Sequence, residues 1–114
     1  MLDLPPAIIC EAPRAIDGDT LACGNLPAHV RLLGIDAPEL PGHCRPGRRC
    51  TPGDGTASAA SLARLLTTGP ATIRPVALDR YGRILARVMI AGLDLSCAMV
   101  VRGAAVYRYG RIDC

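Results

Sequence analysis

The chain contains no phenylalanine and no tryptophan, and its only aromatic residues are three tyrosines. Its core must therefore be built from aliphatic side chains, which are plentiful because half of all residues are hydrophobic. No run of about 18 apolar residues occurs, which excludes a membrane-spanning helix. No signal peptide is visible in the first ten residues, which lack a basic stretch and a long apolar segment. The 114 residues suffice for one domain, residues 1–114.

Lysine is also absent, so all thirteen basic residues are arginines, against ten acidic residues and a net charge of +3. The use of arginine in place of lysine has two explanations. One is the base composition of the genome, and the other is the ability of the planar guanidinium to bind phosphate through two hydrogen bonds. The net charge alone predicts only a weak, salt-sensitive attraction to nucleic acid. It does not identify an enzyme.

The six cysteines are an even number and contain none of the C-x2-C pairs typical of zinc sites. Disulfides, a zinc site using His43 and its neighbouring cysteines, and free buried thiols are all open readings, with disulfides favoured. Fifteen pairings are possible, and we predict the one between sequence neighbours: Cys10–Cys23, Cys44–Cys50 and Cys97–Cys114. Disulfides imply export to an oxidising compartment, either the periplasm or the outside of the cell.

The pattern of apolar and turn-forming residues predicts five strands and two helices. The strands cover 7–16, 20–23, 29–35, 71–77 and 84–90, with a hairpin turn at Asp17-Gly18. The helices cover 56–68 and 95–102, the second with Asp94 as its N-cap and Gly103 as its stop. A helix inserted after the third of five strands predicts a mainly β protein with helices (α+β), a five-stranded Greek-key barrel of the OB type.

Three short segments hold nearly every side chain suited to chemistry on a phosphodiester: Asp17-Gly18-Asp19-Thr20, Arg31-Leu32-Leu33-Gly34-Ile35-Asp36-Ala37-Pro38-Glu39 and Asp79-Arg80-Tyr81-Gly82-Arg83. Hydrolysis of this bond needs charge neutralisation at phosphorus, a positioned water and a base. Taken singly, each segment also fits an ordinary turn or a surface ion pair. Taken together, they supply carboxylates, arginines and a candidate base.

The carboxylates of Asp19 and Asp36 are expected to meet at one rim of the barrel. Two facing carboxylates repel unless a cation lies between them, and oxygen ligands favour Ca²⁺ or Mg²⁺. Arg31 lies five residues before Asp36, so a regular strand would place the two side chains on opposite faces. His29 and His43 have no partner in sequence that would make either of them a general base.

In order and in near-spacing, the three segments resemble the staphylococcal nuclease (thermonuclease) family of OB-fold, Ca²⁺-dependent nucleases. The resemblance extends from about Ile8 to Tyr109 and includes both predicted helices. It implies hydrolysis of DNA and RNA, with a preference for single strands or frayed duplex, and products that carry a 3′-phosphate. We expect a monomer that does not bind membranes.

The resemblance also implies roles for individual residues. It makes Asp19, Asp36 and the backbone carbonyl of Ala37 the Ca²⁺ ligands, and Arg31 and Arg83 the phosphate-binding arginines. It makes Glu39 the carboxylate that activates or orients water. It places Arg80, Tyr81 and Tyr109 beside the nucleotide.

The chain departs from the family pattern at Ala37, where threonine is usual, and in the loop after Glu39, which carries Cys44 and Cys50 in place of a flexible lysine-rich stretch. One rival interpretation is an OB-fold module that binds single-stranded nucleic acid without cutting it. A disulfide-rich structural protein is a second, but it leaves the three segments unexplained.

Overall fold

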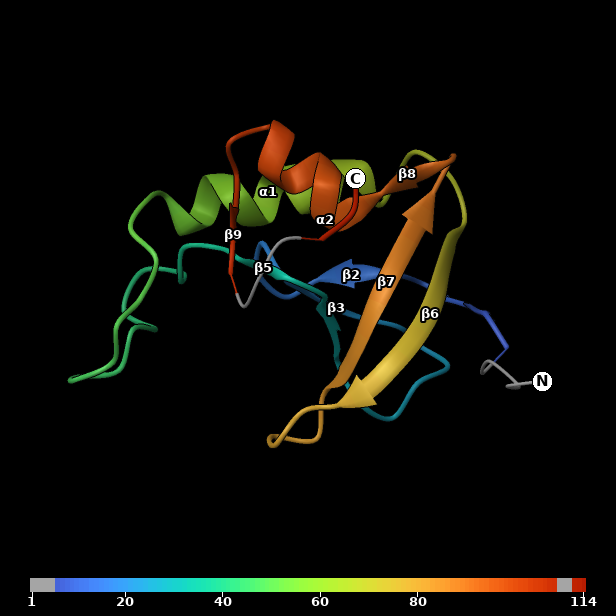
Figure 1. The fold of residues 1–114 in the computed structure, drawn as a ribbon, viewed down its shortest axis with the longest axis horizontal. Helices are drawn as coiled ribbons and strands as arrows, with labels where there is room; N and C mark the ends of the chain where they lie inside the picture. The colour runs from blue at the N-terminus through green and yellow to red at the C-terminus, as the bar shows by residue number, and fades with distance from the viewer. Residues whose placement is uncertain (1–5, 109–111) are drawn as a thin grey trace.

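The computed structural model describes residues 6–108 and 112–114. Its described part is mainly β with two helices, and the main sheet curls into a half-barrel of the OB type, as predicted (Figure 1). In chain order the elements are β1 (Ile8–Ile9), β2 (Arg14–Ala15), β3 (Thr20–Ala22), β4 (Val30–Leu32), β5 (Ile35–Asp36), α1 (Gly55–Leu65), β6 (Ala71–Leu78), β7 (Ile84–Ile90), β8 (Leu93–Asp94), α2 (Leu95–Val101) and β9 (Val106–Tyr107).

The main sheet has the strand order β1-β6-β7-β4-β3-β2, with β8 added beside β7. Strands β2, β3 and β4 form the predicted antiparallel meander. The long β6–β7 hairpin joins this meander through a parallel pairing of β4 with β7, in which Val30 lies opposite Ile84. A separate small sheet pairs β5 with β9 and so brings the end of the chain beside the segment that carries Asp36.

Two of the five predicted strands are broken, and two short strands, β8 and β9, are added. The 7–16 strand divides into β1 and β2 because Ala12 turns the backbone at φ +48° and Pro13 has no N–H to continue the ladder. The 29–35 strand ends at Leu32, and Gly34 reverses the chain at φ +78°, a conformation that favours glycine. This second break redirects the residues that follow β4.

Both helices begin at a capping aspartate and lie over the same side of the half-barrel (Figure 1). Asp54 accepts a hydrogen bond from the Ala57 N–H, and Asp94 accepts from the Ser96 and Cys97 N–H groups. Leucine, isoleucine, valine and methionine side chains fill the space beneath them, as the lack of large aromatics requires. Among the described residues, no helix has the length and apolar character needed to cross a membrane.

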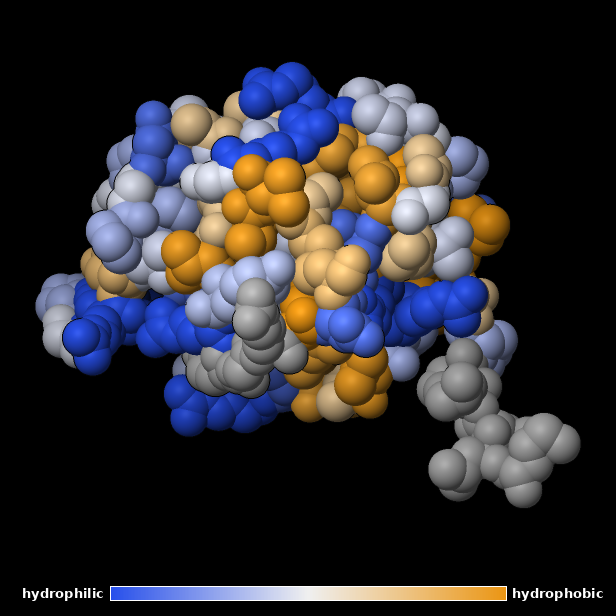
Figure 2. All heavy atoms as spheres, turned by 45° about the horizontal axis from the view of Figure 1, so that its top comes forward, coloured by the Kyte–Doolittle hydropathy of each residue, from blue (hydrophilic) through white to orange (hydrophobic). Residues whose placement is uncertain are grey.

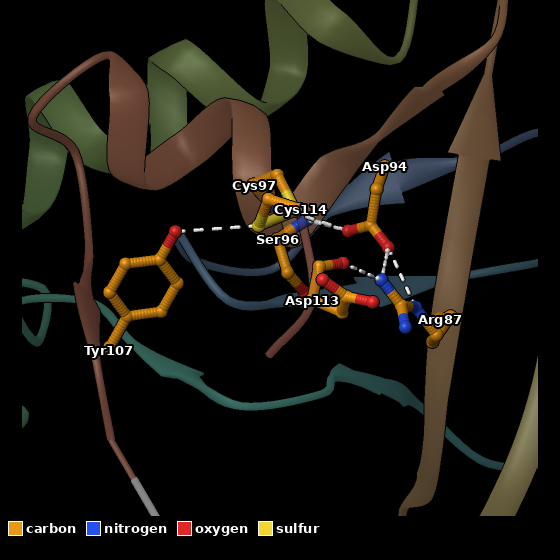
Figure 3. The surroundings of a disulfide bond; sticks show 7 residues. All are labelled: Arg87, Asp94, Ser96, Cys97, Tyr107, Asp113 and Cys114. Atoms are coloured by element: carbon orange, nitrogen blue, oxygen red, sulfur yellow. Dashed lines mark hydrogen bonds and ion pairs between the residues drawn. A yellow bond between two sulfur atoms is a disulfide. The ribbon is translucent and has the colours of Figure 1, made fainter. Parts of the chain in front are cut away.

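The three predicted disulfides are all present: Cys10–Cys23, Cys44–Cys50 and Cys97–Cys114. Figure 3 shows the last of these joining the end of the chain to α2, with the Tyr107 hydroxyl 3.3 Å from the Cys114 sulfur. Nearby, Arg87 forms an ion pair with Asp94 and donates a hydrogen bond to the Asp113 carbonyl. These bonds hold the described end of the chain, residues 112–114, against the rest of the fold.

Candidate active-site cleft

The predicted site residues gather around one cleft of about 1110 Å³. Seven of the eight predicted side chains that could reach substrate or metal line it: Asp19, Arg31, Asp36, Glu39, Arg80, Tyr81 and Arg83. Ala37 was predicted to contribute only its backbone, and it is buried next to Asp19. Tyr109 lies outside the described residues. Segments separated by more than 40 residues of chain therefore converge on one depression.

The guanidinium of Arg31 lies between the two predicted metal-binding carboxylates. Its Nη2 is 3.4 Å from Asp19 Oδ2 and 3.1 Å from Asp36 Oδ1, while Nη1 donates to the carbonyls of Leu32 and Ile35. The opposite-face prediction for Arg31 and Asp36 is therefore wrong. The break at Gly34 ends the regular strand, and the chain folds back so that both side chains meet.

Asp19 is the most deeply buried acidic residue of the cleft, with 6% of its surface exposed. The pKa of its carboxyl is raised to about 6, chiefly by burial and also by the neighbouring Asp17. The Arg31 charge and the Ala37 N–H, which donates to Oδ2 at 2.9 Å, lower the pKa without cancelling the effect of burial. Asp19 therefore sits where more positive charge would stabilise its ionised form.

Asp36 is held by side chains from three parts of the chain. In addition to Arg31, its Oδ2 accepts hydrogen bonds from the Thr51 hydroxyl and from Arg108 Nη1, the latter at 2.8 Å. Arg108 directly follows β9, whose pairing with β5 brings it to this position. Neither Thr51 nor Arg108 was predicted from the sequence, because a contact across 72 residues leaves no periodic signal.

Asp79 organises the β6–β7 turn and orients Arg83. Its Oδ1 accepts the backbone N–H groups of Tyr81 and Arg83, and its Oδ2 accepts Arg83 Nε at 2.7 Å. Burial alone would raise the pKa of Asp79, but these hydrogen bonds and the Arg83 charge outweigh it and lower the pKa. Because the pair uses Nε, the Nη groups of Arg83 can point towards the cleft that this residue lines.

The Tyr81 ring is exposed and lies beside two cations. The guanidinium carbons of Arg80 and Arg83 lie 4.9 Å and 5.5 Å from the ring centroid, within the range of a cation–π contact. Arg80 also donates to the Tyr81 hydroxyl at 2.7 Å. The turn thus presents an aromatic face and two arginines at the cleft, the combination that suits a nucleotide.

Glu39 is half-buried at the edge of the cleft, just after the buried Pro38. The first residue of α1, Gly55, packs so closely that a Cβ there would lie 2.0 Å from the Glu39 carbonyl oxygen. Only glycine fits this approach. The helix start therefore fixes the backbone from which the Glu39 side chain reaches the cleft.

The oxygen donors present fit a hard divalent cation. Carboxylates are the ligands that Ca²⁺ prefers, and buried Asp19 remains short of positive charge even beside Arg31. Within 6–108 and 112–114, no three histidine, cysteine, aspartate or glutamate side chains form a metal-binding group. Such a cation would therefore rely on the pair Asp19 and Asp36, a backbone carbonyl and water.

Three arginines of the disulfide-closed loop also line the cleft and were not predicted from the sequence: Arg45, Arg48 and Arg49. The sequence does contain a signal for these residues, because this arginine-rich run replaces the lysine-rich stretch that is usual in the family that the three sequence segments resemble. Figure 2 shows strongly hydrophilic residues projecting at the left end of the molecule, where this loop lies in Figure 1. With them, seven of the thirteen arginines line the cleft, against five acidic residues.

A comparison with models of protein families gives a match over most of the chain. A family model described as staphylococcal nuclease homologue matches residues 29–113, which is more than half of the chain. No curated protein matches the sequence. The matched region includes Arg31, Asp36, Glu39 and Arg83, while Asp19 precedes it.

Proposed function

Because the chain belongs to the staphylococcal nuclease family, we propose that it is a nuclease that hydrolyses phosphodiester bonds of DNA and RNA and depends on Ca²⁺. The observation that carries the proposal is the single cleft that gathers a carboxylate pair, a separate glutamate and several arginines. An OB-type binding module needs the basic and aromatic groups, but it has no use for the carboxylates.

Asp19, Asp36 and the Ala37 carbonyl would hold Ca²⁺, which when bound supplies positive charge at a phosphate oxygen and a site for water. Arg31 also pairs with both carboxylates and so holds them close together. Arg31 and Arg83 neutralise the charge that builds on the phosphoryl oxygens. The Asp79 contact holds Arg83 through its Nε, which supports this role.

Glu39 takes a proton from the attacking water or orients that water towards phosphorus. The water oxygen bonds to phosphorus, and the bond between phosphorus and the 5′ oxygen breaks. One fragment then keeps a 3′-phosphate, and the departing 5′ oxygen takes up a proton from water, so the other fragment carries a 5′-hydroxyl. Arg80 and Tyr81 bind the nucleotide beside this bond.

The proposed reaction requires protein groups on several sides of one phosphate, so we propose that single strands and frayed duplex are preferred. The unit that acts is the single domain of residues 1–114, as a monomer. The three disulfides are compatible with an oxidising extracellular location. We therefore propose that the protein works after export.

Digestion of denatured DNA with Ca²⁺, and with EGTA in its place, tests the proposal. The parent should cut only with Ca²⁺, and its products should carry 3′-phosphates that mass spectrometry detects. The Glu39→Gln variant should cut DNA about 10²–10⁴-fold more slowly than the parent, as expected for the loss of a general base. Glu11→Gln is the matched control, because Glu11 is the only other glutamate of the chain, is exposed and does not line the cleft.

Equal rates for the parent and Glu39→Gln would remove the catalytic assignment of this residue. A parent that never cuts, but binds single strands in a salt-dependent way, would instead identify a non-catalytic OB-fold binding module.

A further inference from the structure

The loop closed by Cys44 and Cys50 carries three arginines that the catalytic proposal does not use. Arg45, Arg48 and Arg49 are all exposed and all line the cleft. None of the ion pairs found within the described residues involves them. Their charges are therefore available to a ligand that enters the cleft from outside.

The loop has no strand or helix to hold these like charges together. Its conformation depends instead on the Cys44–Cys50 disulfide, with Cα atoms 6.2 Å apart, and on the hydrogen bond from the Arg48 N–H to the Arg45 carbonyl. Three neighbouring cations repel one another and would expand an open loop. The closed loop keeps them concentrated at the rim of the cleft.

A second basic wall of the same cleft is formed by the β6–β7 turn with Arg80 and Arg83. Figure 1 shows this turn and the 41–54 loop as separate projections of the molecule. The cleft between these arginines exceeds the roughly 300–1,000 Å³ of a small-molecule site, at about 1110 Å³. It therefore has room for more than the nucleotide on which the reaction takes place.

We propose that the 44–50 loop is a second binding site, for backbone phosphates of the same strand away from the bond that is cut. The ligand is a single-stranded polynucleotide, whose regularly spaced phosphates match several arginines at once. Arginine suits this role because its planar fork binds phosphate through two hydrogen bonds. The proposal rests on the proposed function for the identity of the strand but does not require cleavage.

Equilibrium binding tests this site in EGTA, where no cleavage occurs. The probe is a fluorescent oligothymidylate of about 20 nucleotides, longer than the roughly 4–16 nucleotides that one OB fold covers. Fluorescence anisotropy gives Kd at several salt concentrations between about 0.05 and 0.2 M. The loop variant combines Arg45→Gln, Arg48→Gln and Arg49→Gln.

The expected result follows from counterion release. Each phosphate contact to a single strand contributes about 0.7 to the slope of log K against log salt, so the loop variant should lower the slope by about 2. The same relation gives a loss of roughly 100-fold in affinity at about 0.1 M salt. A variant with lysine at the same three positions should keep most of the slope, because it keeps the charge.

The matched control combines Arg64→Gln, Arg74→Gln and Arg102→Gln, three exposed arginines that do not line the cleft. It removes the same charge and should leave the slope close to that of the parent. An equal loss of slope in both variants, or an unchanged slope in the loop variant, would overturn the proposal. So would a lysine variant that binds as poorly as the glutamine variant.

The catalytic proposal and the loop proposal can fail separately. A parent that never cuts DNA but binds with the expected slope keeps the loop site and loses the nuclease assignment. A parent that cuts with Ca²⁺, with a loop variant that binds as the parent does, keeps the nuclease and loses the loop site.

Discussion

Two aspartate–arginine pairs face the same cleft, yet the pKa of one carboxyl is raised above that of an ordinary aspartate and the pKa of the other is lowered. Asp19 lies 3.4 Å from Arg31 in a buried setting, and its pKa is raised to about 6. Asp79 lies 2.7 Å from Arg83 in the β6–β7 turn, where both side chains are more exposed, and its pKa is lowered. A neighbouring arginine alone therefore does not decide the ionisation of an aspartate.

The difference lies in what the carboxylate gains in return for lost hydration. Asp79 accepts two backbone N–H groups and a guanidinium, and these bonds favour its ionised form over the neutral one. Asp19 is buried more deeply and shares Arg31 with Asp36, so its desolvation is only partly compensated. We infer that the buried pair, Asp19 with Arg31, is suited to bind a cation. The turn pair, Asp79 with Arg83, is suited to orient its arginine.

The largest expected effect is on turnover. Arg31 and Arg83 should contribute to it to a similar extent, despite their different surroundings. Arg31→Lys and Arg83→Lys keep the charge but lose the planar fork, so turnover of denatured DNA should fall by about 10³–10⁵. Rates at saturating substrate with Ca²⁺ measure this. Arg74→Lys, an exposed change outside the cleft, serves as the control and should leave turnover unchanged. Full turnover in Arg83→Lys would mean that the turn pair only supports the fold.

The second effect separates the carboxylates by their ability to bind Ca²⁺. Asp19→Asn and Asp36→Asn each remove a charged oxygen that would bind Ca²⁺ directly. Each should weaken Ca²⁺ binding by more than the roughly 10–100-fold that is typical when a residue hydrogen-bonded to a metal ligand is lost. Asp79→Asn should leave the affinity unchanged, because this carboxylate already neutralises Arg83. Titration calorimetry compares the three variants. Loss of affinity in Asp79→Asn alone would reverse the roles given to the two pairs.

A smaller effect is expected on folding stability at the turn. Asp79→Ala removes three hydrogen bonds to a charged acceptor, so the free energy of unfolding should fall by about 1–3 kcal/mol. Urea denaturation followed by circular dichroism measures it. Asp113→Ala, near the end of the chain, provides an exposed comparison. An equal, small change in both would show that the Asp79 bonds are not what holds the turn.

The smallest effect is the pH dependence of the stability that the Asp79–Arg83 pair contributes. The folded-state pKa of Asp79 lies below the ordinary 3.8, so its contribution to stability is present above 3.8 and disappears as pH falls through the folded-state pKa. The stability difference between the parent and Asp79→Asn should shrink below pH 3.8 accordingly. NMR titration of the carboxyl gives the pKa directly. A value above 3.8 would contradict the account of the turn.

Local signals predicted much of this structure. The capping Asp94, both helices and the β6–β7 hairpin follow from periodicity and turn chemistry. The Cys10–Cys23 bond was also predicted, although a regular hairpin turning at Asp17-Gly18 would place these cysteines out of register. The kink at Ala12 removes that conflict and leaves their Cα atoms 5.2 Å apart.

The site was harder to predict where it depends on chain breaks and distant partners. No pattern indicated that Gly34 would end a strand and turn Arg31 and Asp36 towards each other. The contact of Arg108 with Asp36 comes from the pairing of β5 with β9, two strands too short to give a period. Motifs identified the reacting groups, whereas only the tertiary fold reveals which of them touch.

The Cys44–Cys50 bond also decides what proteolysis can do to this molecule. A trypsin-like protease that cuts after Arg48 or Arg49 would cleave the chain within the ring that this disulfide closes. The other two disulfides each lie entirely on one side of such a cut, so this bond alone would keep the two fragments covalently joined. The nicked protein would run as one species until a reducing agent separates it, with residues of the cleft on both pieces.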